Sequence, residues 1–111
     1  MRIGILGGTG PAGRGLAARL ASIGYEVVIG SRVKDRAMEI RDSLVERWPD
    51  LDALLQYGDN PTAAGADLVV IATPWDSAAT TAQEHEGRLR GKIVVSMANA
   101  LVRVLSRPAR S

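Results

Sequence analysis

A glycine-rich segment near the N-terminus has the residue types and spacing of a phosphate-binding loop. Gly8, Gly10 and Gly13 fit the pattern G-x-G-x-x-G. They follow a short apolar run at residues 2–6 and precede a helical pattern, the context in which this motif is informative. Gly8 would allow a tight turn, Gly10 would let the backbone approach a pyrophosphate, and Gly13 would let helix and strand pack closely. The loop therefore predicts a bound dinucleotide, the alternative being a glycine-rich turn without a ligand.

The residues around these glycines also suit the start of a helix. Pro11 has a fixed φ and no N–H, which the first helical turn accommodates. The free N–H groups and the partial positive charge at a helix start favour a bound anion. We therefore place Thr9, Pro11 and Ala12 in the predicted cofactor site with the three glycines.

The end of the second predicted strand indicates which dinucleotide to expect. Folds that prefer NAD usually carry Asp or Glu there, whereas this chain has Ser31-Arg32. A hydroxyl and a guanidinium would hold a 2′-phosphate that a carboxylate would repel. Lys34 or Arg36 would add a further contact. The sequence thus predicts NADP over NAD, the alternative being a solvated basic helix start.

Alternating strand and helix patterns must position these residues. Strands are expected at 2–6, 26–30, 53–57, 67–73 and 92–97, and helices after the loop, at 34–48, at 62–66 and from 76 or 77 to about 86. Gly24 occupies the place of a left-handed helix cap. The alternation predicts an α/β fold of the Rossmann type, a doubly wound parallel sheet of five strands in the order 3-2-1-4-5.

This strand order determines which segments can share a site. The crevice should open at the carboxyl ends of the first and fourth strands. It would bring the glycine loop and Ser31-Arg32 together with the ends of two later strands, Thr73-Pro74-Trp75 and Met97-Ala98-Asn99.

Composition argues against several other functions. The 111 residues include no cysteine and a single histidine, His85, so we expect no metal site and no catalytic triad. A formal charge of +2 without a large basic face or stacking aromatics argues against nucleic-acid binding. No apolar run is long enough for a membrane span and no leader precedes the first strand, so a cytoplasmic protein is expected. His85 lies in a polar helix end and is expected to be solvated.

The loop and the second strand end together resemble a known family. Residues 5–17 and 28–32, with Thr73-Pro74-Trp75 and residues 92–96, resemble the NADPH-dependent coenzyme F420 reductases, which are deazaflavin-dependent NADP oxidoreductases. The resemblance covers residues 1 to about 102. It implies NADP(H) as cofactor, F420 as second substrate, and direct hydride transfer between nicotinamide and deazaflavin without a catalytic acid, base or metal.

The resemblance also implies roles for individual residues. Thr9, Ser31 and Arg32 would hold the 2′-phosphate, and the glycine loop the pyrophosphate. The strand ends at 74–75 and 97–99 would border the nicotinamide. Trp75 equally suits the core, and Asn99 would either bind the carboxamide or cap the chain after its strand.

The predicted domain organisation follows from where the resemblance ends. Residues 1–102 are expected to form the NADP-binding domain, and residues 103–111 a disordered basic tail. Family members continue well beyond this length with the part that builds much of the deazaflavin pocket, so a truncated chain is expected. An open sheet edge would then favour a homodimer, or the chain would need a missing C-terminal partner domain.

Three other functions were weighed against this one. The chain could be a non-catalytic NADP-binding module or remnant that lacks the second-substrate domain. It could also be the N-terminal domain of another NADP-dependent reductase acting on imines or semialdehydes. An extended short-chain dehydrogenase is disfavoured, because neither Tyr25 nor Tyr57 is followed four residues later by the required lysine.

Overall fold

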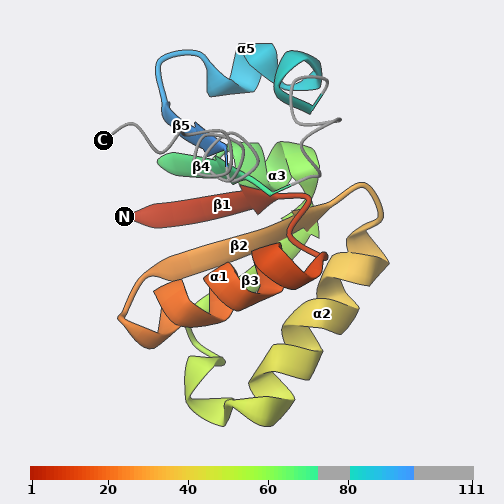
Figure 1. The fold of residues 1–111 in the computed structure, drawn as a ribbon, viewed down its shortest axis with the longest axis vertical. Helices are drawn as coiled ribbons and strands as arrows, with labels where there is room; N and C mark the ends of the chain where they lie inside the picture. The colour runs from red at the N-terminus through yellow and green to blue at the C-terminus, as the bar shows by residue number, and fades with distance from the viewer. Residues whose placement is uncertain (73–80, 97–111) are drawn as a thin grey trace, which may run out of the picture.

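A computed structural model describes residues 1–72 and 81–96. Within these residues, five parallel strands form one sheet in the order β3-β2-β1-β4-β5 (Figure 1). The strands are β1 (Arg2–Leu6), β2 (Glu26–Ser31), β3 (Leu55–Asp59), β4 (Leu68–Ile71) and β5 (Ile93–Ser96). The predicted α/β fold with a doubly wound sheet in the order 3-2-1-4-5 is confirmed.

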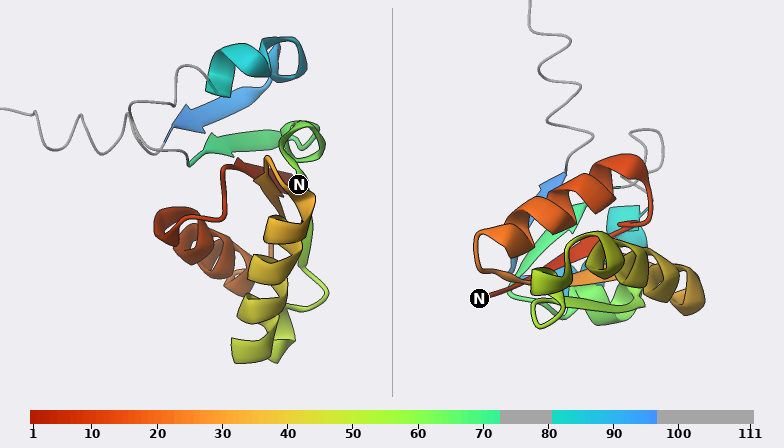
Figure 2. Two further views of the ribbon diagram at one scale, coloured as in Figure 1. Left: turned by 90° about the vertical axis from the view of Figure 1, so that its right-hand side faces the viewer. Right: turned by 90° about the horizontal axis from the view of Figure 1, so that it is seen from below.

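Helices cover both faces of the sheet. One face carries α1 (Pro11–Ser22), α2 (Lys34–Arg47) and the short 3-10 helix η1 (Pro49–Leu51). The other face carries α3 (Asn60–Ala64) and α5 (Glu86–Leu89), and Figure 2 shows α1 and α3 on opposite sides of the strands. No helix in the described part of the chain has the length and hydropathy needed to cross a membrane.

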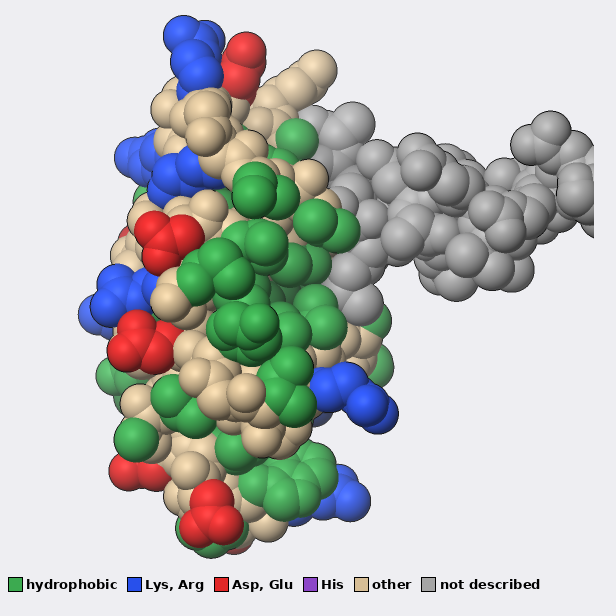
Figure 3. All heavy atoms as spheres, turned by 90° about the vertical axis from the view of Figure 1, so that its left-hand side faces the viewer, with side chains coloured by type: hydrophobic (Ala, Val, Ile, Leu, Met, Phe, Trp, Pro, Cys, Tyr) green, Lys and Arg blue, Asp and Glu red, His purple; other side chains and the backbone are tan. Residues whose placement is uncertain are grey.

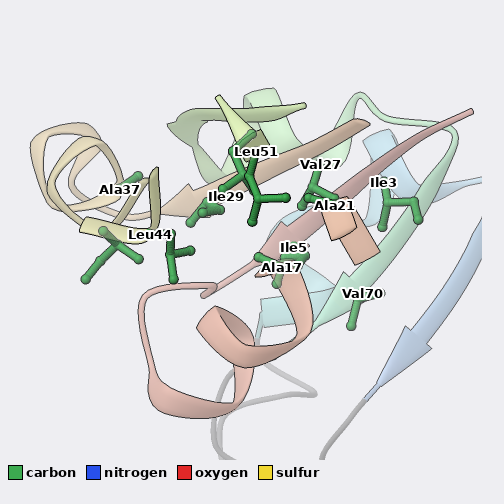
Figure 4. Close-up of a cluster of buried hydrophobic side chains, with 12 residues drawn as sticks. Ile3, Ile5, Ala17, Ala21, Val27, Ile29, Ala37, Leu44, Leu51 and Val70 are labelled. Carbon is green, nitrogen blue, oxygen red and sulfur yellow. The ribbon is translucent and has the colours of Figure 1, made fainter. Parts of the chain in front are cut away.

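The core is split into two layers by the sheet. Ile5 and Leu6, adjacent in β1, are both fully buried because successive side chains of a strand point to opposite faces. Ile5 joins the cluster under α1 and α2, where it packs with Ile29 and Ala17 (Figure 4). Leu6 joins the cluster under α3 and α5. Apolar residues on both faces are typical of a parallel sheet covered by helices.

The short helix α3 lies directly on the strand backbones. A Cβ atom at Gly4 would overlap the Ala63 carbonyl, and one at Gly30 would lie 2.7 Å from the Ala63 Cβ. The two glycines therefore allow a helix of five residues to pack against the centre of the sheet. Through this contact α3 packs against the backbones of β1 and β2, the two strands that end beside the glycine loop.

Two helix ends are built by identifiable side-chain or backbone contacts. Gly24 has φ 102°, and the Tyr25 N–H donates to the Leu20 carbonyl at 3.2 Å, which confirms the predicted cap of α1. At α3, Asp59 Oδ1 accepts the Thr62 N–H at 2.9 Å and the Thr62 hydroxyl at 2.7 Å. These hydrogen bonds lower the pKa of Asp59. They also explain why α3 begins at Asn60, two residues before the predicted start.

The prediction that His85 is solvated is wrong, since the residue is only 7% exposed. Its neighbours Glu84 and Glu86 are exposed, as a polar helix end suggests. However, Thr81, His85 and Leu89 follow one another at four-residue spacing, and all three are buried. Within the described residues, His85 Nδ1 has no hydrogen-bond partner. The polar composition of the neighbouring residues therefore does not determine the burial of this histidine, which lies at the N-cap of α5.

Candidate functional site

The glycine loop makes its turn at Gly7. This residue has φ 67°, a left-handed conformation that glycine adopts without strain. Gly8, to which the tight turn was assigned, instead lies against two strands. A Cβ at Gly8 would be 3.1 Å from Ile5 Cγ2 and 3.2 Å from Ile29 Cγ2. The Gly8 N–H donates to the Gly30 carbonyl at 2.9 Å, which fixes the loop to the end of β2.

Gly13 brings α1 close to the loop. A Cβ at this position would lie 2.7 Å from the Gly8 Cα, a distance that real contacts do not reach. The helix starts one turn earlier, where the Arg14 N–H donates to the Gly10 carbonyl at 2.9 Å. The structural requirement for glycine at position 13 therefore agrees with the role expected of it, close packing of the helix.

The space in front of Gly10 is open. No described atom lies within 4 Å of a Cβ placed at Gly10, so backbone there is accessible to a ligand. The N–H groups of Ala12 and Gly13 belong to the first turn of α1, whose donors have no partner inside the helix. That turn contains no acidic residue to neutralise the helix dipole. The loop thus offers a set of N–H donors and a positive field to an anion.

Asn60 supports the loop from below and was not predicted. Its side chain is 6% exposed, and Oδ1 accepts the Gly7 N–H at 3.1 Å. The sequence indicated only a turn here, Gly58-Asp59-Asn60-Pro61. The position of Asn60 directly after a strand could have indicated this contact, because the carboxyl ends of parallel strands lie at the same edge of the sheet as the loop.

The end of β2 lies beside this loop, and its residues differ in exposure. Ser31 is 7% exposed, and its Oγ accepts the Val33 N–H at 3.2 Å, so its hydroxyl hydrogen remains available as a donor. Arg32 and Lys34 are exposed, and neither forms an ion pair with a described residue. Arg36 is exposed as well, but its guanidinium lies 3.7 Å from the Glu39 carboxylate.

Six predicted site residues lie outside the described part of the chain: Thr73, Pro74, Trp75, Met97, Ala98 and Asn99. The strands that precede them are described. Ile71 at the end of β4 pairs in register with Leu6 of β1, and the Ala72 N–H donates to the Leu6 carbonyl at 2.9 Å. Ser96 at the end of β5 pairs with Ile71. The carboxyl ends of β1, β4 and β5 are therefore neighbours.

Comparison with known proteins agrees with this geometry. Residues 2–100 match the family model described as NADP oxidoreductase, coenzyme F420-dependent. The F420-dependent NADP reductase of Methanocaldococcus jannaschii is 37% identical over 101 residues. That of Methanothermobacter thermautotrophicus is 35% identical over 96 residues. A solved structure of a candidate F420-dependent NADP-reductase from Arthrobacter sp. FB24 is 31% identical, with a TM-score of 0.70.

These relatives are longer than the chain. The alignments cover 87% and 86% of this chain, but only 44% and 41% of the two archaeal reductases. The Arthrobacter structure shows the same relation, with 87% of this chain and 44% of that one covered. The chain therefore spans less than half the length of the relatives it matches. Because the family model matches nearly all of it, the chain belongs to the coenzyme F420-dependent NADP oxidoreductase family.

Proposed function

We propose that this chain binds NADP(H) at its glycine loop and provides the nucleotide-binding part of a reductase that exchanges hydride between NADPH and coenzyme F420. The observation that carries the proposal is the open, donor-lined space at Gly10, next to the exposed cations at the end of β2. A pyrophosphate fits such a loop, and a 2′-phosphate fits the adjacent basic segment.

In this proposal two segments of the chain, the glycine loop and the end of β2, bind different phosphates of the nucleotide. The N–H groups of the loop would hold the pyrophosphate, while Thr9, Ser31 and Arg32 would hold the 2′-phosphate. Lys34 is exposed and would add charge, and it also interacts electrostatically with Asp59. Arg36 is already close to Glu39 and would contribute less. The Val33 N–H fixes the Ser31 Oγ, so that hydroxyl is positioned before a ligand arrives.

The chemistry itself belongs to the two coenzymes. A bound nicotinamide supplies a hydride, and this chain's residues bind and orient its nucleotide. We propose that Thr73 to Trp75 and Met97 to Asn99 border the nicotinamide, since they follow strands that end beside β1. In this proposal residues 1–102 are the NADP-binding domain and residues 103–111 a basic tail. Cysteine-free composition suits a reducing compartment, and we propose the cytoplasm.

Replacing Arg32 with Asp tests the choice of nucleotide. The substitution replaces a charge-assisted donor with a repelling carboxylate, so the Kd for NADPH should rise by roughly 30-fold or more. The Kd for NADH should change little. Both are measured by the fluorescence of the bound dihydronicotinamide.

Arg47→Asp makes the same change of charge at the last residue of α2, at the opposite end of that helix from β2, and should leave both constants unaltered. Unchanged selectivity in Arg32→Asp would contradict the assignment of the 2′-phosphate site. Mixing the chain with NADPH and F420 and following dihydronicotinamide absorbance asks separately whether it transfers hydride. Binding without turnover would favour a module that needs a partner domain or a second copy to complete the deazaflavin site.

A further inference from the structure

An open groove of about 910 Å³ lies between α1 and the second half of α2, apart from the end of β2 where the 2′-phosphate is proposed. Its lining is formed by one side of α1, between Pro11 and Ser22, and by some of the residues between Ser43 and Leu51. In Figure 1 these two helices diverge from the glycine loop toward η1. The groove is therefore long and open at the surface, and not a closed cavity.

The floor and one wall of this groove are apolar. Leu44 and Leu51 belong to the core under α1 and α2, and Ala18 packs against the same core. Trp48 lines the groove with 43% of its surface exposed. Tryptophan side chains that are accessible beside an apolar floor are typical of protein interfaces.

The rim is positively charged. Arg14, Arg19 and Arg47 line the groove, against a single carboxylate, Asp50. None of these three arginines forms an ion pair with a described residue, whereas four other arginines do, namely Arg2, Arg36, Arg41 and Arg90. The Arg47 guanidinium instead lies 4.8 Å from the centre of the Trp48 ring. The groove thus combines an apolar floor with cations that form no ion pair with the described residues.

We propose that this groove docks an acidic amphipathic helix of a partner protein. The twelve residues of α1 span about 18 Å, which suits a helix of similar length better than a compact small molecule. The partner's apolar stripe would lie on Ala18, Leu51 and Trp48, and its flanking carboxylates would meet the arginines. The chain's own residues 103–111 carry three arginines and no acid, so charge disfavours them as the occupant.

A peptide selection tests this proposal without a known partner. Helical peptides displayed on phage are selected against the folded chain, and the binders are measured by fluorescence anisotropy. The selected peptides should be rich in Asp and Glu beside an apolar stripe. Their binding should weaken with rising salt, since exposed charge pairs are screened.

Two variants locate the binding surface. Gly15→Tyr places a side chain in the groove, and a Cβ there meets no described atom within 4 Å, so the fold should tolerate it. Arg19→Glu with Arg47→Glu reverses the rim charge. Each variant should weaken peptide binding at least about tenfold, because the anchor or the charge complement is lost.

Arg88→Glu with Arg90→Glu is the matched control, since it changes net charge equally on α5, outside the groove. This control should bind the peptides as the unmodified chain does, and circular dichroism should show all variants folded. Peptides that lack acidic residues, or that bind the groove variants and the unmodified chain equally, would overturn the proposal. So would sedimentation showing a dimer that Gly15→Tyr abolishes, because a second copy would then be the occupant.

Discussion

The two edges of the sheet are protected very differently. At the β3 edge, the Arg41 side chain donates from Nε to the Leu55 carbonyl at 3.0 Å and from Nη2 to the Asp52 carbonyl at 2.8 Å. At the β5 edge, Ile93 is 65% exposed, and Val94 and Val95 are also exposed. A charged side chain that covers an edge strand prevents it from pairing with another chain, and an exposed apolar edge does the opposite.

The face that carries the amino ends of the strands also exposes apolar side chains. Figure 3 shows hydrophobic side chains along the middle of that face, with charged side chains around them. Exposed apolar residues lie at or just before the amino ends of three strands, with Met1 before β1, Ile23 and Tyr25 before β2, and Ile93 at the start of β5. An apolar surface of this kind marks an interaction site.

The first half of the molecule, β1 to β3 with α1 to α3, has an edge partly covered by Arg41, whereas the edge of the second half, β4 and β5, is apolar and exposed. In the first half, Arg41 covers the start of β3, helices pack on both faces of the sheet, and the loop is held by the Gly8–Gly30 hydrogen bond and by Asn60. The second half presents exposed apolar side chains along β5. Substitutions at Gly4 and Arg41 test the stability of the first half, and substitutions on β5 test association through the second half.

Gly4→Val should cause the largest loss of stability. Its Cβ would overlap the Ala63 carbonyl, so α3 would have to move away from the sheet. We expect the free energy of unfolding to fall by about 3 kcal/mol or more, measured by urea denaturation. Gly15→Ala is the control, because its Cβ meets open space and alanine favours a helix by about 0.5–1 kcal/mol. Equal stability of the two variants would show that α3 does not support the first half.

Arg41→Met should cost about 1–2 kcal/mol of unfolding free energy. The substitution removes the hydrogen bonds to the Leu55 and Asp52 carbonyls and keeps a flexible apolar stem. Arg36→Met, which loses only an exposed pair with Glu39, should cost less than about 0.5 kcal/mol. If both substitutions have the same effect, Arg41 does not close the β3 edge.

Ile93→Lys with Val95→Lys should change association more than stability. Both residues are exposed on β5, so unfolding free energy should shift by no more than about 0.5 kcal/mol. Lysine on an edge strand opposes pairing, and the concentration-dependent mass of the chain in sedimentation should fall to that of a monomer. If the unmodified chain stays monomeric at high concentration, the β5 edge does not mediate self-association.

The sequence predicted features that depend on short-range patterns. The apolar runs and the spacing of Gly8, Gly10 and Gly13 were enough for the strand order and the position of the loop. Features set by packing between distant segments were missed. Asn60 lies in α3, which packs on Gly4 and Gly30, and from there it accepts the Gly7 N–H. His85 is buried although its neighbours in the sequence are polar.

The exact bounds of some strands and the position of the loop turn were also not predicted from the sequence. β3 begins at Leu55, not at residue 53, because η1 at Pro49–Leu51 and the turn after it occupy the preceding positions. The left-handed residue of the loop is Gly7, which the G-x-G-x-x-G pattern does not include. Local patterns thus located the loop, while its supports required the three-dimensional structure.

The most direct test of the central claim is a titration of the isotope-labelled chain with NADPH, followed by the backbone amide signals in NMR spectra. The account predicts saturable shifts at Thr9 to Gly13 and at Ser31 to Val33, with NADH binding more weakly. Signals on α5 should not move. Shifts confined to other surfaces, or no binding of NADPH, would contradict the account.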